Sequence, residues 1–354
     1  MNQLSVIEVV SGLGMGGAEK SFLSRLNFMP ENFQVTVVNT RPELDSWQLP
    51  ARISSVNCSR KNLSFIFRLN QAVRNFSPDV VIVRSPIDLL ASSLVKCFAR
   101  RKWKLVYEAH SVEISQNLLV SKALTPLVRI ANTQTDLVIA VSRSVAHGPQ
   151  CLGAKRLEVH HLGAIAKVQE NSKRNFTFLF IARFVALKQP LLLLEAISSL
   201  ADLFLSHGAK VKLIGKGPLE AEMVRFIALN ELEGVVEVCG YSDDLDSIYS
   251  GSEYLLSTSK YEGLPITFFE AKLHGLRIIS TPSSGDFDIL GPEDCVLQDF
   301  LVDTLVHGIK SALEGGPLTE ECRALIQRKN AWMRAESRAQ GYYDLIQSDS
   351  TELQ

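Results

Sequence analysis

The sequence has few of the features that mark secreted, membrane-spanning or nucleic-acid-binding proteins. Its six cysteines are scattered and form no C-x-x-C pair, so neither a disulfide framework nor a zinc site is expected. No apolar run approaches the roughly 20 residues of a membrane span, and the amino terminus lacks the basic flank and long apolar core of a signal peptide. The formal net charge of −1 argues against a nucleic-acid-binding protein. We therefore expect a cytoplasmic protein, at most attached peripherally to the inner face of the cell membrane.

What is present is typical of a globular α/β protein. The 354 residues suffice for two domains of roughly 150–200 residues each, and a hydrophobic content of 46% is ordinary. Short apolar runs alternate with helical segments, which predicts two doubly wound, Rossmann-like parallel sheets. We expect a first domain at residues 1–166, a polar linker at 167–175 and a second domain at 176–330. A last helical segment spans 320–346; its part at 331–346 is expected to return to the first domain, ahead of a polar tail at 347–354.

A glycine-rich loop, GLGMGG at residues 12–17, lies between an expected strand and an expected helix. It satisfies G-x-G-x-x-G, but the dinucleotide fingerprint also needs an acid at the end of the second strand. That position reads Val38-Asn39-Thr40. A nicotinamide cofactor is therefore disfavoured, and two interpretations remain: a loop whose amides approach a phosphate or sugar, or a simple tight turn.

The stretch at residues 253–285 predicts a strand, a polar loop and a helix that starts at Pro265 and ends near Gly275. The amides of Leu264, Ile266 and Thr267 would be free to bind an anion at the start of that helix.

Glu262 and Glu270 bracket the helix start in an E-x7-E pattern. Carboxylates are good acceptors for the vicinal hydroxyls of a ribose or a sugar. For two acids alone, the alternative is a solvated loop charge and a helix-face charge.

Further candidates follow other strands of the second domain. Arg183 and Lys188 come after its first strand, where two cations suit a diphosphate, although solvated surface cations are the alternative. Gly217, in the turn Gly215-Lys216-Gly217-Pro218, permits close backbone approach. Tyr241 could lie against a nucleobase or simply pack.

His110 ends a first-domain strand, where a histidine can hydrogen-bond a sugar hydroxyl or a structural partner. The D-x-D of Asp244 and Asp246 is interpreted as a capped helix start and not as a metal site. No metal and no cofactor are predicted.

In this order and spacing, the motifs resemble the retaining glycosyltransferases of the GT-B fold, in glycosyltransferase family four. The resemblance spans nearly the whole chain and rests on Gly16-Gly17-Ala18-Glu19, Ala182-Arg183-Phe184 with Lys188, Gly215-Lys216-Gly217-Pro218, and Glu262-Gly263-Leu264-Pro265 through Glu270-Ala271. Lys216 stands where the family often has an acid, and Gln189 where glycine or asparagine is common. Both departures leave the nucleotide open.

The resemblance implies a role for each matching residue. Glu270 would hold the donor ribose, Glu262 would contact the transferred sugar, and His110 would face that sugar as the second catalytic residue. The implied donor-binding residues are Gly16, Gly17, Arg183, Lys188, Gly217, Tyr241, Gly263, Leu264, Pro265, Ile266 and Glu270.

The implied activity is metal-independent, retaining transfer of a hexose-type sugar from a UDP- or GDP-linked donor to a saccharide or lipid-linked acceptor. Cell-surface polysaccharide or lipopolysaccharide biosynthesis is the expected setting. The alternatives are a GT-B sugar-nucleotide epimerase or hydrolase, or a non-catalytic nucleotide-binding module.

A basic, aromatic segment of the first domain suggests a further partner. It contains Lys96, Phe98, Arg100, Arg101, Lys102, Trp103 and Lys104. Such a patch can attract an anionic membrane surface that presents a lipid-linked acceptor; a solvated helix end is the alternative.

Overall fold

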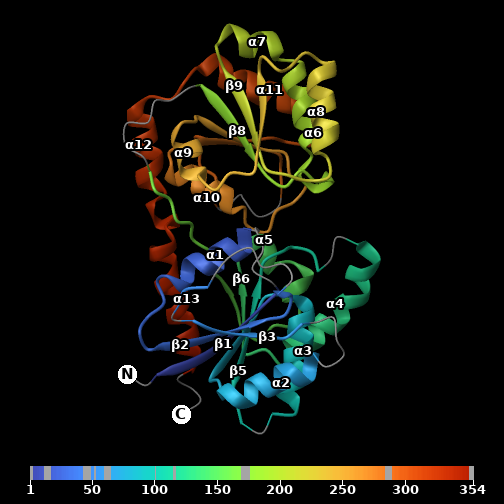
Figure 1. Cartoon of the computed structure of the whole chain (residues 1–354), viewed down its shortest axis with the longest axis vertical. Coiled ribbons are helices and arrows are strands. Elements are labelled where there is room, and N and C mark those ends of the chain that lie inside the picture. Colours follow the sequence, from blue (N-terminus) through green and yellow to red (C-terminus); the bar gives the residue numbers. More distant parts are fainter. Residues whose placement is uncertain are drawn as a thin grey trace. The chain divides into compact units, whose positions relative to one another are not determined.

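The computed structural model (Figure 1) describes residues 3–11, 17–42, 49–51, 53–59, 65–99, 101–114, 117–168, 176–283 and 289–350. Contacts divide the chain into two compact units: Met1–Ala164 with Ala335–Gln354, and Ile165–Arg334. Several predictions fall outside the described residues, namely those on Gly16 and the rest of the glycine loop at 12–16, on Arg100, on Gly285 and on linker residues 169–175. The first unit is discontinuous in sequence, because its last segment follows the whole of the second unit.

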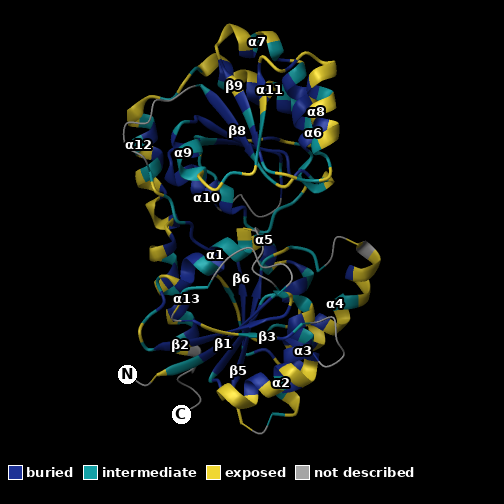
Figure 2. Ribbon diagram, viewed as in Figure 1, coloured by how far each residue is buried: buried dark blue, intermediate teal, exposed yellow. Residues whose placement is uncertain are grey.

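The first unit is built on a seven-stranded parallel sheet of order β3-β2-β1-β4-β5-β6-β7. Its strands are β1 (Leu4–Val10), β2 (Phe33–Asn39), β3 (Ser54–Asn57), β4 (Val80–Val83), β5 (Lys104–Ala109), β6 (Leu137–Ala140) and β7 (Leu157–Val159). The central strands β4, β5 and β6 are wholly buried (Figure 2). Burial on both faces explains why their sequences are nearly continuous apolar runs.

Helices cover this sheet. They are α1 (Gly17–Leu26), α2 (Phe65–Phe76), α3 (Pro86–Cys97), α4 (Leu118–Asn132), α5 (Arg143–Ala146), the 3-10 turn η2 (Pro149–Cys151) and α13 (Ala335–Ser350). Helices α1 and α13 contact each other, and Phe22, Leu26, Tyr342 and Tyr343 from them share one core with Val6 of β1. Helix α3 contacts both α2 and α4, so these three lie side by side (Figure 1).

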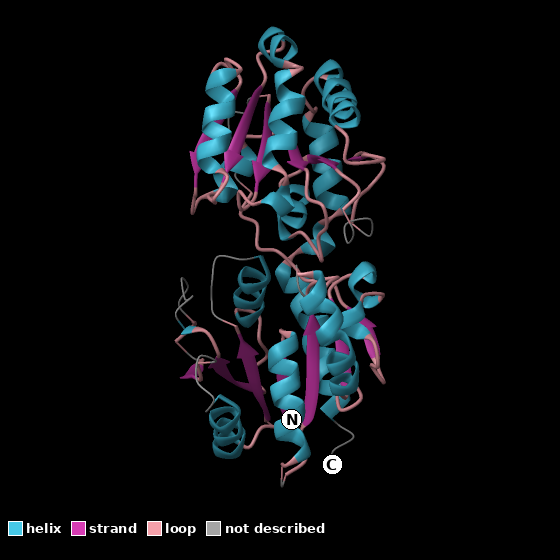
Figure 3. Ribbon diagram, turned by 90° about the vertical axis from the view of Figure 1, so that its right-hand side faces the viewer, coloured by secondary structure: helices cyan, strands magenta, loops and turns pink. Residues whose placement is uncertain are grey.

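The second unit has a six-stranded parallel sheet of order β10-β9-β8-β11-β12-β13 (Figure 3). Its strands are β8 (Thr177–Ile181), β9 (Lys210–Ile214), β10 (Val236–Gly240), β11 (Tyr254–Ser257), β12 (Arg277–Ser280) and β13 (Cys295–Val296). Its helices are η3 (Ala186–Lys188), α6 (Pro190–Ser198), α7 (Ala201–Ser206), α8 (Glu220–Leu229), α9 (Leu245–Ser250), α10 (Ile266–Leu273), α11 (Val302–Gly315), α12 (Glu320–Lys329) and η4 (Ala331–Met333). Two parallel sheets with helices confirm the predicted α/β class.

One helical segment of the second unit is interrupted, and one helix start was predicted wrongly. Residues 190–204 form two helices, because Leu200 leaves the helical region at φ −117° and ψ 9°. The Ser199 hydroxyl next to it donates to the Glu195 carbonyl at 3.3 Å, a local bond that competes with regular helix. Pro265 was expected at the first helical position of α10 but lies just before it, at φ −76° and ψ 106°.

The segment 320–346 is not one helix either. The Asn330 side chain donates to the Ile326 carbonyl at 2.8 Å where α12 ends, and Arg334 is extended at φ −64° and ψ 139°. Helix α13 then runs to Ser350, so residues 347–350 of the predicted tail are helical. Ala339, Tyr342 and Ile346 recur at helical spacing and are buried in the first unit, so this face holds α13 on the first sheet.

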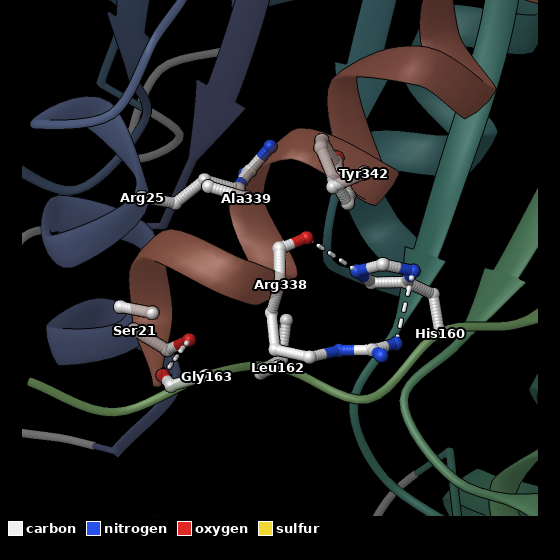
Figure 4. A pocket seen from close by; sticks show the side chains of 9 residues that line it. Ser21, Arg25, His160, Leu162, Gly163, Arg338, Ala339 and Tyr342 are labelled. Carbon is white, nitrogen blue, oxygen red and sulfur yellow. Dashed lines mark hydrogen bonds between the residues drawn. The ribbon is translucent and has the colours of Figure 1, made fainter. Parts of the chain in front are cut away.

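The packing of α13 centres on His160 at the end of β7 (Figure 4). His160 Nε2 lies 2.9 Å from the Arg338 carbonyl oxygen, and Arg338 Nη2 lies 3.3 Å from His160 Nδ1. Burial lowers the pKa of His160 to about 4, so the neutral ring donates on one side and accepts on the other. The cavity beside these residues measures about 10 Å³, which is room for one water molecule and not for a substrate.

Candidate active site

In each sheet the order of strands reverses direction at one point. Strands β1 and β4 are neighbours in the first unit, and β8 and β11 are neighbours in the second. Ligands of open parallel sheets bind beyond the carboxyl ends of the strands at such points. The segment after β8 carries Arg183 and Lys188, and the loop after β11 carries Glu262. Residues far apart in sequence are therefore brought to the switch point of the second unit.

Hydrogen bonds join these two loops directly. The Thr258 hydroxyl lies 2.8 Å from the Lys188 carbonyl oxygen and 3.0 Å from that of Gln189. The Lys260 amide donates to the Leu187 carbonyl at 2.9 Å. Gln189 is held at φ 47°, a left-handed conformation that is uncommon outside glycine. The loops are thus held in one arrangement before any ligand binds.

Lys188 and Glu262 form the central ion pair of this site. Lys188 Nζ contacts Glu262 Oε1, and the Ser259 hydroxyl donates to the same carboxylate oxygen at 2.7 Å. The two charged side chains are 19% and 16% exposed, so both can meet a ligand while being shielded from bulk water. The pair joins a cation suited to phosphate with a carboxylate suited to hydroxyl groups.

Two glycines hold the segment that carries Arg183. A Cβ atom on Gly215 would lie 1.9 Å from the Ala182 carbonyl oxygen, and one on Gly217 would lie 2.4 Å from that of Phe184. The close approach at Gly217 is therefore made to the protein's own backbone. Arg183 lies between these contact points with an exposed side chain.

The start of α10 follows Glu262 after three residues. Gly263 and Leu264 are half-buried, whereas Pro265 and Ile266 are buried. Pro265 makes no side-chain cap, so the amides of the first helical turn have no capping side chain. This end of the helix favours negative charge, as does Lys188 beside it.

Glu270 lies one turn further along α10 and is 3% exposed. Its Oε2 accepts a hydrogen bond from the Tyr249 hydroxyl at 3.0 Å. Burial, and then the negative charge of Glu270, raise the pKa of Tyr249 well above its usual value, so the phenol remains a donor. His274 stacks on the Tyr249 ring at 5.3 Å between centroids. The structure thus places Glu270 in a buried, ordered group.

Tyr241 follows β10, two strands away from β8, and is 42% exposed. Burial and a hydrogen bond to Asp243 raise the pKa of its phenol. Asp244, by contrast, accepts from the Ser247 amide at 3.1 Å, which confirms that it caps the start of α9.

The remaining predicted residues belong to the first unit. Gly17 begins α1 and is exposed. His110 follows β5, and its Nε2 lies 2.7 Å from Glu108 Oε1. His110 thus lies directly after the carboxyl end of a strand, whereas Gly17 lies at the start of a helix.

Sequence analysis did not identify the roles of Thr258, Ser259 or Tyr249. Thr258 and Ser259 were visible only as part of a polar loop, and Tyr249 only as the end of a short helical segment. Tyrosine and serine are common hydrogen-bonding residues, and their spacing from Glu270 and Glu262 is not a recognisable signal. Their roles depend on contacts between segments.

Only part of the predicted basic patch at residues 96–104 lies at the surface: Phe98 is 74% exposed, and Arg101 and Lys102 are exposed. Trp103 and Lys104 are 3% and 6% exposed. Lys96 pairs with Asp136, and Arg101 Nη2 lies 3.0 Å from Asp79 Oδ1. The cations were predicted from their spacing, but the acids that neutralise them are distant in sequence.

Comparisons with known proteins agree with this architecture. The sequence model described as glycosyltransferase family 4 matches residues 15–163, and the one described as glycosyl transferases group 1 matches residues 164–332. CapH of Staphylococcus aureus, a capsular polysaccharide biosynthesis glycosyltransferase, is 22% identical over 294 residues, which are 78% of this chain and 81% of CapH.

Solved structures show the same fold. HepE of Anabaena in complex with UDP-glucose matches with a TM-score of 0.74 at 16% identity, covering 98% of this chain and 100% of HepE. WaaG, a glycosyltransferase involved in lipopolysaccharide biosynthesis, matches with a TM-score of 0.75 at 13% identity, covering 96% of this chain and 99% of WaaG. The two units therefore have the GT-B architecture that the motifs predicted. The chain belongs to the GT-B glycosyltransferases that join a family 4 domain to a group 1 domain.

Proposed function

We propose that this glycosyltransferase is a retaining enzyme that moves a hexose-type sugar from a UDP- or GDP-linked donor to a saccharide or lipid-linked acceptor. The observation that carries the proposal is the Lys188–Glu262 pair at the switch point of the second unit, between Arg183 and the start of α10. CapH and WaaG are named for capsular polysaccharide and lipopolysaccharide biosynthesis, and HepE binds UDP-glucose. We place this protein in the same class of cell-surface pathway.

The donor would bind by an exchange of partners. Its diphosphate attracts Arg183, Lys188 and the first amides of α10, so Lys188 moves from Glu262 to a phosphate oxygen. Glu262 is then left to accept hydrogen bonds from hydroxyls of the transferred sugar. Glu270 is assigned to the donor ribose, and Tyr249 fixes the orientation of its carboxylate.

In the transfer step, the bond between the anomeric carbon and the donor phosphate oxygen breaks, and both bonding electrons stay with the leaving diphosphate. The acceptor hydroxyl attacks from the same face, and the departing phosphate takes its proton. The cations and helix amides stabilise the charge that develops on the diphosphate. Gly16 and Gly17 are assigned to the phosphate from the first unit, and His110 to the transferred sugar. No step of this scheme requires a metal ion.

The test compares two lysines of the second unit. Lys188→Met removes the proposed phosphate cation, whereas Lys310→Met removes an exposed lysine of α11 that pairs with Glu314 on the same helix. UDP and GDP are added to each protein in a thermal-shift measurement, because a ligand that binds the folded state raises Tm. We expect a shift for the parent and for Lys310→Met, and a much smaller one for Lys188→Met. Equal shifts in all three proteins would show that the diphosphate site is elsewhere.

The competing activities are separated by the need for an acceptor. Labelled UDP- and GDP-hexoses are incubated with the protein, with and without membrane extracts that contain lipid-linked saccharides. Labelled glycan formed only with the acceptor supports transfer. Epimerised or hydrolysed donor at the same rate without an acceptor favours the epimerase or hydrolase, and nucleotide binding without turnover favours a non-catalytic module.

We also propose that the acceptor is reached at an anionic membrane surface, through helices α2 and α4 instead of residues 96–104. On α4, Leu119 is 77% exposed and Ile130 65%, with Lys122 and Arg129 exposed between them. On α2, Phe67 is 68% exposed, and its charged residues are Arg68 and Arg74. Neither helix contains Asp or Glu. Exposed apolar side chains with cations suit an anionic bilayer interface. Within the described residues, no helix is long and apolar enough to cross a membrane.

Vesicle co-sedimentation tests this surface. Lys122→Glu with Arg129→Glu is compared with a charge-matched control in the second unit, Arg225→Glu with Lys310→Glu. Vesicles of phosphatidylglycerol with phosphatidylcholine should bind the parent and the control and release the α4 variant, and 0.5 M salt should weaken binding. Equal binding of both variants, or equal binding to neutral vesicles, would contradict the proposal.

A further inference from the structure

A buried cluster of charges lies beneath His110 in the first unit. Glu8 of β1 and Glu108 of β5 are each 1% exposed, and Arg25 of α1 is 5% exposed. Arg84, just after β4, completes it: its Nη2 lies 2.6 Å from Glu8 Oε2 and 3.3 Å from Glu108 Oε2. Two carboxylates and two guanidinium groups already balance in charge, so the cluster does not need His110 for neutrality.

Arg84 contacts both oxygens of Glu108, but the other partners of the two oxygens differ. Oε2 accepts from the Tyr342 hydroxyl at 2.6 Å and lies 3.4 Å from Arg25 Nη2, so it faces the helices that pack on the sheet. Oε1 faces the other way: it lies 2.7 Å from His110 Nε2 and 3.4 Å from Arg84 Nε. Burial alone would raise the pKa of Glu108, but Arg84, Arg25 and His110 together hold it well below its usual range. The carboxylate is therefore ionised.

This contact fixes one side of the histidine ring. His110 Nε2 is buried, although the side chain as a whole is 16% exposed. The alignment of Nε2 with the carboxylate falls short of a good hydrogen bond, but at 2.7 Å the two atoms would repel without a proton between them. Whenever the ring carries a single proton, that proton therefore lies on Nε2, and Nδ1 is the acceptor.

We infer that Glu108 is a positioning residue for His110, which it holds in the Nε2–H tautomer with Nδ1 presented to a hydroxyl of the transferred sugar. This inference rests on the proposed function for its substrate, but the geometry that carries it lies wholly within the first unit. The buried cations keep Glu108 ionised, and Glu108 fixes the tautomer of the His110 ring.

Two substitutions on the same carboxylate separate positioning from packing. Glu108→Gln keeps the volume and removes the charge opposite His110, and Tyr342→Phe removes the bond to Oε2 and leaves Oε1 in place. We expect Glu108→Gln to lower kcat by about 10- to 100-fold with little change in donor KM, the range seen when a carboxylate that orients a histidine is changed. Tyr342→Phe should lower Tm and leave kcat within about twofold.

A double-variant comparison tests whether Glu108 acts through His110. In a His110→Ala background, Glu108→Gln should have little further effect on kcat. If it lowers kcat by the same factor as in the parent, or if both single variants lower kcat only in proportion to Tm, the cluster is structural and the inference is wrong.

A measurement without activity keeps the inference apart from the proposed function. The 15N chemical shifts of the His110 ring report the tautomer, with the signals assigned by their loss in His110→Ala. The parent should show Nε2–H, and Glu108→Gln should show a mixture. An Nδ1–H ring in the parent overturns the inference even if transfer is observed. If the ring is in the Nε2–H tautomer but no sugar transfer is observed, the result would instead count against the proposed function.

Discussion

The charged groups around His110 and those around Lys188 are arranged in opposite ways. In the first unit, Glu8, Glu108 and Arg25 are almost completely buried and contact one another or Arg84 from several elements. In the second unit, the Lys188–Glu262 pair is partly exposed, and Arg183 is an exposed cation. The first arrangement fixes a geometry, and the second can exchange its partners.

The two groups of charges differ in the free energy that is lost when an ion pair is separated. A buried charge that loses its partner keeps its desolvation penalty, so the cluster of the first unit must stay intact. A partly exposed pair loses less when it opens, because water and then a ligand replace the lost partner. Charges that hold a catalytic side chain should thus be buried, and charges that bind a diphosphate should remain reachable.

The largest effect should separate two arginines of similar sequence context, since each follows a strand at a switch point. Arg84→Met leaves Glu8 and Glu108 with one cation fewer in a buried site, and we expect it to destabilise the protein by about 3–5 kcal/mol. Arg183→Met should change stability by less than about 0.5 kcal/mol, because the side chain is exposed. Urea unfolding monitored by circular dichroism measures both.

In a measurement of nucleotide binding, the order of the two variants should reverse. Arg183→Met is expected to weaken UDP or GDP binding, whereas Arg84→Met should bind the nucleotide normally wherever it remains folded. A stability loss of equal size in both variants would show that the buried and the exposed charges do not differ in their contribution to stability.

A smaller loss of stability is expected at acidic pH, because His160 packs against α13. The pKa of His160 is about 4 in the folded protein and about 6.5 in an unfolded chain. Between these values the unfolded chain binds more protons, so stability is complete above pH 6.5 and falls as the pH is lowered towards 4. The loss should be no more than about 3 kcal/mol. The charged groups that face His160 are Arg338, Arg25 and Glu108.

Urea unfolding at pH 7, 6, 5 and 4.5 measures this loss. His160→Gln should flatten the profile between pH 6.5 and 4.5, and His207→Gln, which changes an exposed histidine of the second unit, should not. A profile that both variants leave unchanged would show that other groups control the acid sensitivity.

The smallest effect should come from Tyr249→Phe in the second unit. The substitution removes one hydrogen bond to buried Glu270 and leaves the ring that stacks on His274. We expect a loss of about 1–2 kcal/mol in stability, together with weaker nucleotide binding if Glu270 holds the ribose. Tyr254→Phe is the control. It removes the hydroxyl of another buried tyrosine of the second unit, and that hydroxyl contacts Arg277 Nη1 at 3.5 Å instead of Glu270. Equal nucleotide affinity in both variants would show that Glu270 does not bind the donor.

The sequence was sufficient for features that depend on neighbours along the chain. The alternation of short apolar runs with helical segments predicted the two parallel sheets, because a buried parallel strand such as β1 or β4 is a local pattern. The Asp244 cap and the glycine turn at Gly215 were found for the same reason. Features that depend on distant segments were not accessible. Asp136 pairs with Lys96 and Asp79 with Arg101, and Asn330 ends α12 through its side chain.

The site itself divides in the same way. Lys188 and Glu262 were each marked by strand-end position and motif, yet the direct contact between them and the role of Thr258 in joining their loops required coordinates. Glu108 lies two residues from His110 and was still missed, because its contacts come from Arg84, Arg25 and Tyr342 in three other segments.

The discontinuity of the first unit has a consequence for biosynthesis. Helix α13 supplies Tyr342, which contacts Glu108, and this helix is made after the whole of the second unit. A nascent chain therefore has the complete first sheet while one face lacks its apolar cover, and it stays so for the whole time in which residues 165–334 are made. Since domains fold in the order of their synthesis, the second unit can mature as an independent insert, whereas the unit that carries His110 is finished only after α13 has been made.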